Sequence, residues 1–271
     1  MKILTLNTHS LCEKEATFKR KLTALWIVEQ QPDVICLQEV NQTMTSSEVD
    51  VDGFFTGKDT IKQDNYAKDL VQDLLELGHQ YHWIWEPVKI GYGKYEEGLA
   101  ILSKTEILDH ESILLTHTDD FNNWKKRKAL GVKIQISNNN LWVYTTHMGW
   151  FNDDEEPFLT QWKKLNRHLK EKSETIILTG DFNAPDCLSG QSYDEIIDSD
   201  WFDAYHLAKK TYGHDTAKGK IDGWENSEIS GMRIDYIFLN KPLSVLNHEV
   251  VFDGENAPIV SDHFGIKMEV D

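Results

Sequence analysis

The stretch Thr175–Pro185 constrains the fold most, because an apolar, β-branched run ends there in polar side chains. Residues 175–179 have the composition of a buried strand. Gly180 breaks the run, and Asp181 and Asn183 follow at a spacing of two. If the extended conformation persists to Asn183, the carboxylate and the amide lie on the same side, where they can orient a water or hold an anionic oxygen. The alternative is a capped turn, for which Gly-Asp-x-Asn is an ordinary composition.

The same pattern, an apolar strand followed by polar or ionisable groups, recurs along the chain. Each case alone has an ordinary explanation as a turn, a solvated strand end or a satisfied loop histidine. Together they supply carboxylates, amides and histidines without a thiolate, a set that suits a hard divalent cation, Mg²⁺ with Mn²⁺ as the alternative, and not structural zinc. The groups are Asn7, Glu39, His147, Asp181, Asn183, Asp262 and His263, with Asp235 early in a further apolar strand.

The remaining pattern predicts one α+β domain over residues 1–271, with layered sheets and no repeat or linker. Helical periodicity indicates three amphipathic helices, roughly at residues 15–30, 66–77 and 158–169. We expect a strand at 34–37, a long loop at 41–64 and a polar, glycine-containing region at 205–231. A loop as long as 41–64 is usually functional or mobile, so a lid over the substrate is open. Further strands are expected at 2–6, 81–85, 98–104, 130–136, 141–145, 234–239 and 266–270.

The charge limits the partners. A net charge of −17 argues against duplex nucleic acid or an anionic membrane as the main partner, because proteins that bind these carry a basic face. The three cysteines are widely spaced and form no disulfide framework or zinc pattern. We see no signal peptide and no run of transmembrane length, so we expect a reduced, cytoplasmic protein. The oligomeric state stays open.

Taken in order, the polar motifs resemble the endonuclease/exonuclease/phosphatase superfamily, which includes DNase I-like nucleases, abasic-site endonucleases, inositol polyphosphate 5-phosphatases and neutral sphingomyelinases. The resemblance implies a DNase I-like fold, a four-layer α/β/β/α sandwich with the active site at one edge of two central sheets. The motifs that carry it span nearly the whole chain and are Leu6-Asn7, Leu37-Gln38-Glu39, Gly98–Lys104, Thr146-His147, Gly180-Asp181-Phe182-Asn183, Arg233-Ile234-Asp235-Tyr236 and Ser261-Asp262-His263.

The resemblance implies a metal site. Glu39 is the expected metal ligand, with Asn7 near the metal and the phosphate. Asp262 is expected to help fix the metal or His147. Glu97 matches the acidic partner of His147 in the DNase-like branch.

The resemblance also implies the catalytic groups. Asp181 would orient or deprotonate the attacking water, and Asn183 would hold a phosphate oxygen. His147 and His263 would contact the phosphoryl group, and Asp235 would orient His263. These roles suit hydrolysis of a phosphate ester, in which a cation and preorganised donors stabilise developing charge.

Two features bear on the substrate. The one dense basic run, residues 125–128, is ordinarily a solvated face, but it can hold a single phosphate, with Arg127 the best candidate. Trp124, Trp150 and Trp224 fall in expected loops near the site. They suit the apolar faces of sugar rings, or alternatively they pack the loops down.

The branch of the superfamily is also constrained. Abasic-site nucleases carry Asp at the position of His9, which counts against that branch. The opening Leu6–Ser10, the segment Gly91–Gly98 and His147–Trp150 are similar to a bacterial cytoplasmic branch that includes maltose 6'-phosphate phosphatases. We therefore expect metal-dependent hydrolysis of a phosphate monoester, a small sugar phosphate such as maltose 6'-phosphate. The alternatives are a nuclease or other phosphodiesterase, including a sphingomyelinase-like enzyme, and a catalytically dead binding module.

Overall fold

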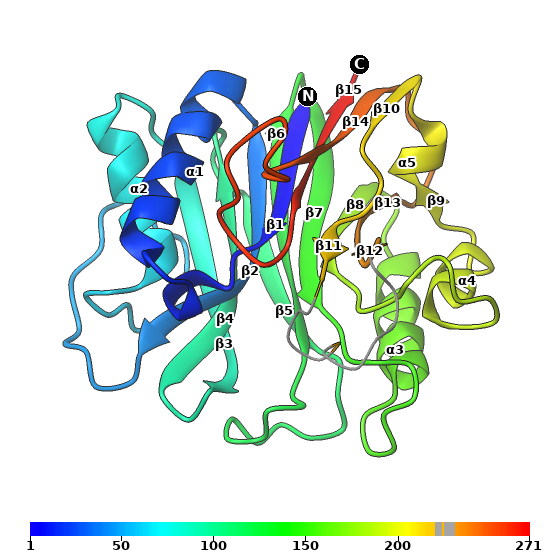
Figure 1. The fold of residues 1–271 in the computed structure, drawn as a ribbon, viewed down its shortest axis with the longest axis horizontal. Helices are drawn as coiled ribbons and strands as arrows, with labels where there is room; N and C mark the ends of the chain where they lie inside the picture. The colour runs from blue at the N-terminus through cyan, green and yellow to red at the C-terminus, as the bar shows by residue number, and fades with distance from the viewer. Residues whose placement is uncertain (220–223, 225–230) are drawn as a thin grey trace.

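Two mixed β-sheets lie face to face between two layers of helices (Figure 1). The computed structural model describes residues 1–219, 224 and 231–271. Helices α1 and α2 cover one sheet, and α3 and α4 cover the other. The four-layer α/β/β/α sandwich expected from the sequence is confirmed. The helices are α1 (Ala16–Gln30), α2 (Tyr66–Glu76), α3 (Phe158–Lys170), α4 (Ser192–Ile197) and α5 (Ala204–Leu207), with a 3₁₀ turn η1 (Ser10–Cys12).

Each sheet has its own strand order. The first sheet runs β10 (Lys210–Tyr212), β14 (Val245–Val251), β15 (Gly265–Val270), β1 (Lys2–Asn7), β2 (Val34–Thr43), β4 (Tyr95–Ser103), β3 (His82–Gly91). The second runs β5 (Asp109–Leu114), β6 (Lys128–Ile136), β7 (Asn139–His147), β8 (Thr175–Asp181), β13 (Asp235–Leu239), β9 (Phe202–Asp203). A small ribbon pairs β11 (Ala217–Lys218) with β12 (Gly231–Met232).

The apolar runs of the central strands are continuous because both faces are buried. On β2, Ile35 packs under α1 and α2 while Cys36 faces the second sheet. On β8, Ile177 faces the first sheet while Ile176 and Leu178 pack under α3. The period of two therefore divides each strand between two hydrophobic layers and places the polar strand ends at the edge between the sheets.

The three expected helices are confirmed, but the expected end of the strand at residue 37 is wrong. Strand β2 continues to Thr43, and its register against β4 shifts between Leu37 and Val40. Glu39 sits in this bulge with a φ of 52°. A bulge bends a strand and re-aims its side chains, which is how Glu39 is turned out of the ladder. Because the residues after Val40 are polar, the hydrophobic pattern does not indicate that the strand continues to Thr43.

The segment between β2 and α2 packs against the first sheet. Phe54 and Phe55 lie against its outer hydrophobic layer, and the ring of Phe55 is 4.6 Å from that of Trp83. Of the polar region expected at 205–231, residues 220–223 and 225–230 lie outside the described residues. None of the helices in the described part is long and apolar enough to cross a membrane.

Candidate active site

Strand register brings three of the predicted residues into one row. Strand β7 pairs in parallel with β8 so that His147 lies opposite Asp181. Strand β13 pairs antiparallel with β8, and Asp235 lies opposite Asp181 from the other side. Gly180 permits the close approach of β7 and β8, because a Cβ there would lie 2.0 Å from the carbonyl oxygen of Thr146. The end of the second sheet thus presents a histidine and two carboxylates side by side.

Asn7 joins this row to the first sheet. Its amide nitrogen donates to Glu39 Oε1 at 2.9 Å and to Asp181 Oδ2 at 3.1 Å. Its amide oxygen accepts the backbone N–H of His9 at 3.2 Å. In this arrangement Asn7 holds two carboxylates with its amide nitrogen, and its amide oxygen is occupied by the backbone of His9.

The backbone after Asp181 turns. Strand β8 ends at Asp181, and Asn183 has a φ of 48°, so of the two possibilities left open by the sequence the turn is the one observed. The carboxylate of Asp181 accepts the backbone N–H of Asn183 at 2.9 Å, which is the capped turn. The turn still aims the Asn183 amide at the site, because its nitrogen donates to the carbonyl of Met148 at 2.9 Å and lies 3.2 Å from His147 Nε2.

His263 lies between two carboxylates. Its Nδ1 is 2.9 Å from Asp235 Oδ2, and its Nε2 is 3.7 Å from Asp181 Oδ2. Burial alone would lower the pKa of His263, but Asp235 and Asp181 raise it to about 10. His263 is therefore a cation at neutral pH. In turn, burial and the charge of Asp235 raise the pKa of Asp181, which makes this carboxylate a stronger base.

His147 has the opposite character. Burial, followed by the charges of Arg127, Lys89 and His263, lowers its pKa well below the ordinary value. Its Nδ1 faces Glu39 Oε1 at 3.7 Å and its Nε2 faces Asp181 Oδ2 at 3.5 Å. A neutral imidazole here can accept one hydrogen bond and donate another.

Glu97, the acidic partner of His147 implied by the resemblance, has a different partner. It pairs with Lys89, whose Nζ is 3.2 Å from Glu97 Oε1. The acidic neighbours of His147 among the described ion pairs are Glu39 and Asp181. Sequence reasoning missed Lys89, although a lysine inside the run Trp83–Gly91 is a signal, since lysine is seldom buried in a strand without a partner.

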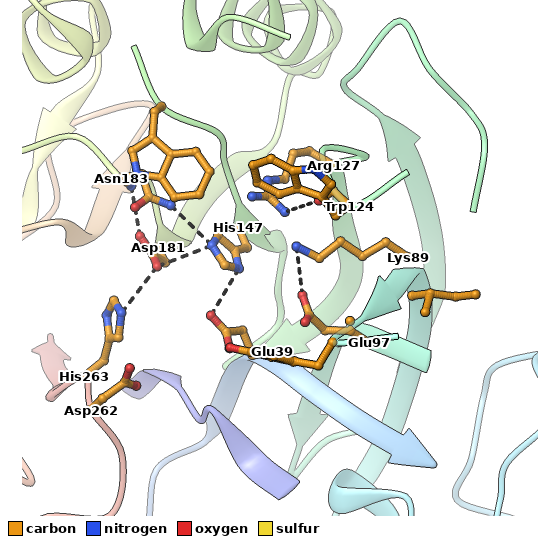
Figure 2. Close-up of a pocket in the computed structure, with 14 residues that line it drawn as sticks. Glu39, Lys89, Glu97, Trp124, Arg127, His147, Asp181, Asn183, Asp262 and His263 are labelled. Atoms are coloured by element: carbon orange, nitrogen blue, oxygen red, sulfur yellow. Dashed lines mark hydrogen bonds and ion pairs between the residues drawn. The ribbon is translucent and has the colours of Figure 1, made fainter. Parts of the chain in front are cut away.

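Most of these residues line one pocket of about 330 Å³, whereas Asn7 and Asp235 are not among its lining residues (Figure 2). One side of the pocket holds Asp181, Asn183 and His263, and the opposite side holds Lys89 and Arg127. The remaining lining residues are Glu39, Ile90, Gly91, Tyr92, Glu97, Trp124, His147, Trp150 and Asp262.

Arg127 is a buried cation, and one of its N–H donors has no hydrogen-bond partner in the described part of the chain. Only 3% of it is exposed, and its guanidinium lies over the ring of Trp150, 5.8 Å from the centroid. One amino group donates to the carbonyl of Trp124 at 3.4 Å. Its Nε is buried with no hydrogen-bond partner among the described residues. A buried guanidinium with an open donor is a site for an anionic oxygen.

The aromatic residues divide into two groups. Trp124 and Tyr92 are 52% and 56% exposed and line the mouth of the pocket, while the ring of Trp150 contacts both the Arg127 guanidinium and the Trp124 ring. Trp224, predicted to bind substrate, is absent from the described lining. Its indole N–H donates to Asn183 Oδ1 at 2.9 Å, which fixes the direction of that amide.

The carboxylate of Glu39 and its acidic neighbours Glu97 and Asp262 fit a divalent cation. Burial, followed by the charges of Glu97 and Asp262, raises the pKa of Glu39, so a positive charge there would be stabilised. Carboxylate oxygens are the ligands that Mg²⁺ and Mn²⁺ prefer. A second group, Asp181, Asp235 and His263, is buried and compact, but its imidazolium already supplies the positive charge.

Comparison with known proteins agrees with this geometry. The sequence model of the Endonuclease/Exonuclease/phosphatase family matches residues 4–263. The chain belongs to this family. A member of the endonuclease/exonuclease/phosphatase family from Leptotrichia buccalis has a solved structure that is 32% identical, covers 100% of this chain and 99% of its own, and has a TM-score of 0.88. Endonuclease/exonuclease/phosphatase enzymes hydrolyse phosphoester bonds and are generally dependent on a divalent metal.

Solved structures at lower sequence identity share the fold, and their names give different substrates. A mannosyl-6-phosphatase from Bacteroides thetaiotaomicron is 17% identical over 100% of this chain and 99% of its own, with a TM-score of 0.68. TDP2 from D. rerio, solved with a single-strand DNA product, is 17% identical over 100% of this chain and 98% of its own, with a TM-score of 0.69. No curated protein matches the sequence. The fold therefore leaves the substrate to be argued from the pocket.

Proposed function

We propose that this protein hydrolyses the phosphate monoester of a small phosphorylated sugar. The observation that carries the proposal is the pocket, whose inner wall holds the buried cations Lys89 and Arg127 and whose mouth exposes Trp124 and Tyr92. A volume of about 330 Å³ is in the range of small-molecule sites. Buried cations suit a phosphate, and exposed aromatic rings suit the apolar face of a sugar.

The charge of the chain supports a small substrate. A net charge of −17 repels a polynucleotide, whose binding depends on displacing counterions with lysine and arginine. Near the pocket mouth, Lys125 is paired with Asp153 and Glu155 at 3.0 Å each, so this member of the basic run is neutralised. Arg127 is buried inside the pocket and faces its interior.

The side chains have complementary roles in the reaction. Asp181, with its raised pKa, accepts a proton from a water whose oxygen attacks phosphorus. The P–O bond to the sugar breaks, and the leaving oxygen takes a proton from the solvent or from His263. His263, held cationic by Asp235, stabilises the charge on the phosphoryl oxygens, and the Asn183 amide and neutral His147 donate hydrogen bonds to them.

A divalent cation belongs to this proposal, with Mg²⁺ first and Mn²⁺ as the alternative. Glu39 and Asp262 are the residues that would hold it, with Asn7 orienting Glu39. When bound, the ion supplies Lewis-acid polarisation of a phosphoryl oxygen and positive charge for the buried carboxylates.

The test is phosphate release with Mg²⁺ from a panel of sugar phosphates that includes maltose 6'-phosphate. Abasic-site DNA and sphingomyelin run alongside, and Asp181→Ala is the inactive control. We expect release from a sugar phosphate that falls at least about a hundredfold in the variant, as expected for loss of a general base. Cleavage of the DNA or the lipid with no release from any monoester would contradict the proposal.

A further inference from the structure

The pocket is closed at one end by a layer of buried charges. Lys89 and Arg127 lie on the side of His147 away from Asp181 and His263 (Figure 2). Lys89 is 7% exposed and Arg127 is 3% exposed, and both line the pocket. Figure 2 shows the Lys89 side chain extending toward His147 with its ammonium group beside Glu97. Lys89 lies on β3 of the first sheet and Arg127 directly precedes β6 of the second, so the layer bridges the two sheets.

Beside this layer there is almost no space. The adjoining cavity has a volume of about 10 Å³, and its lining includes Glu39 and His147 as well as Lys89, Glu97 and Arg127. Such a volume accommodates no more than about one water molecule. A phosphoryl oxygen can therefore meet the two cations, but a carbon substituent on that oxygen has no room beyond them.

We propose that Lys89, together with Arg127, makes the site selective for phosphate monoesters over phosphodiesters. The inference rests on the proposed phosphatase function. A monoester has three free oxygens and a charge near −2, whereas a diester has two free oxygens and a charge of −1. With the attacking water at Asp181 and the sugar at the aromatic mouth, the third free oxygen of a monoester points at the cations. In a diester that oxygen carries a substituent and meets the closed wall.

The pairing with Glu97 explains how Lys89 stays buried without substrate. A lone buried ammonium group is costly, and Glu97 on the neighbouring strand lies opposite Lys89 in register. Its Oε1 neutralises the charge at 3.2 Å. A dianionic phosphate competes better for Lys89 than a monoanionic diester does, because its charge is larger.

The experiment compares two substrates with the same leaving group, 4-nitrophenyl phosphate and methyl 4-nitrophenyl phosphate. The variants are Lys89→Met and, to avoid an unpaired Glu97, the double variant Lys89→Met/Glu97→Gln. Lys125→Met is the matched control, because it removes a lysine charge near the mouth without changing the pocket lining. Circular dichroism and thermal unfolding establish that each variant is folded.

We expect the ratio of kcat/KM for the monoester to that for the diester to fall about ten- to a hundredfold in both Lys89 variants, as for loss of a charged hydrogen bond. It should be unchanged in Lys125→Met. Titration with inorganic phosphate provides a second readout, and its Kd should rise by a similar factor. Equal losses on both substrates, or an unchanged ratio and Kd, would overturn the role of Lys89. If the wild type releases phosphate from no monoester, the proposed function itself fails.

Discussion

His248 gives a quantitative prediction about stability. It lies on β14, 1% exposed, with the ring of Tyr205 edge-on at 5.3 Å. Neither ring nitrogen has a hydrogen-bond partner in the described part of the chain. Burial lowers the pKa of His248 from 6.5 to about 4, against a partial opposing effect of Asp203. The imidazole is therefore neutral in the folded protein and gains a proton more readily when the chain unfolds.

The sign and size of the effect follow from this difference. The unfolded chain binds a proton below pH 6.5, whereas the folded protein binds it only near pH 4, so stability is lost as the pH falls between these values. The gap corresponds to about 3 kcal/mol, at about 1.4 kcal/mol for each pH unit. Above pH 6.5 the histidine contributes no slope.

The assay is urea unfolding followed by tryptophan fluorescence, at pH values from 4 to 8. The perturbation is His248→Leu, with His248→Gln as a second residue that does not ionise but keeps a polar side chain. The free energy of unfolding of the wild type relative to each variant should fall by about 3 kcal/mol between pH 7 and pH 4. The difference in unfolding free energy between wild type and variant should have the same pH dependence for both variants, although the two variants differ in stability at pH 7. Parallel curves for wild type and both variants would refute the reasoning.

Three further predictions concern the active site. Asp235→Asn removes the charge that holds the pKa of His263 near 10, so the alkaline limb of the kcat profile should move toward neutral pH. At pH 8, kcat should fall at least about tenfold, and an unchanged pH profile would argue against the role of the Asp235–His263 pair. Gly180→Ala places a Cβ 2.0 Å from the carbonyl oxygen of Thr146 at a φ of +135°, so urea unfolding should show a loss of at least about 3 kcal/mol, and a loss under about 1 kcal/mol would contradict the close approach. Removal of divalent metal by chelation should lower phosphate release at least about a hundredfold, with recovery on adding Mg²⁺; full activity of the metal-free protein would contradict the metal site.

The sequence indicates which side chains lie at strand ends, and the structure brings several of them together. Asn7, His147 and Asp181 are the last residues of their strands, and Asp235 is the first of its own. An apolar run identifies such a strand, and the polar group after it is then placed at the sheet edge. These polar groups form one site if the strand ends of the two sheets lie at the same edge of the molecule. Two packed sheets in a layered α+β fold meet this condition.

Other parts depend on register and could not be predicted from the sequence. The sequence predicts Glu39 as a site residue but not the bulge that positions it, because a bulge shifts which residues oppose each other without leaving a clear composition signal. Lys89 faces Glu97 only because the pairing of β3 with β4 also shifts, between Pro87 and Lys89. Trp224 lies far from Asn183 in the chain, so its hydrogen bond to that amide is purely tertiary.

The most direct test of the central claim is a turnover of the sugar phosphate in water labelled with ¹⁸O. With the attacking water at Asp181 and the phosphorus beside His147, the released phosphate should carry one ¹⁸O and the sugar none. The same experiment with Asp181→Ala should release no labelled phosphate. Label in the sugar, or release of a phosphate that is still esterified, would contradict hydrolysis of a monoester at this pocket.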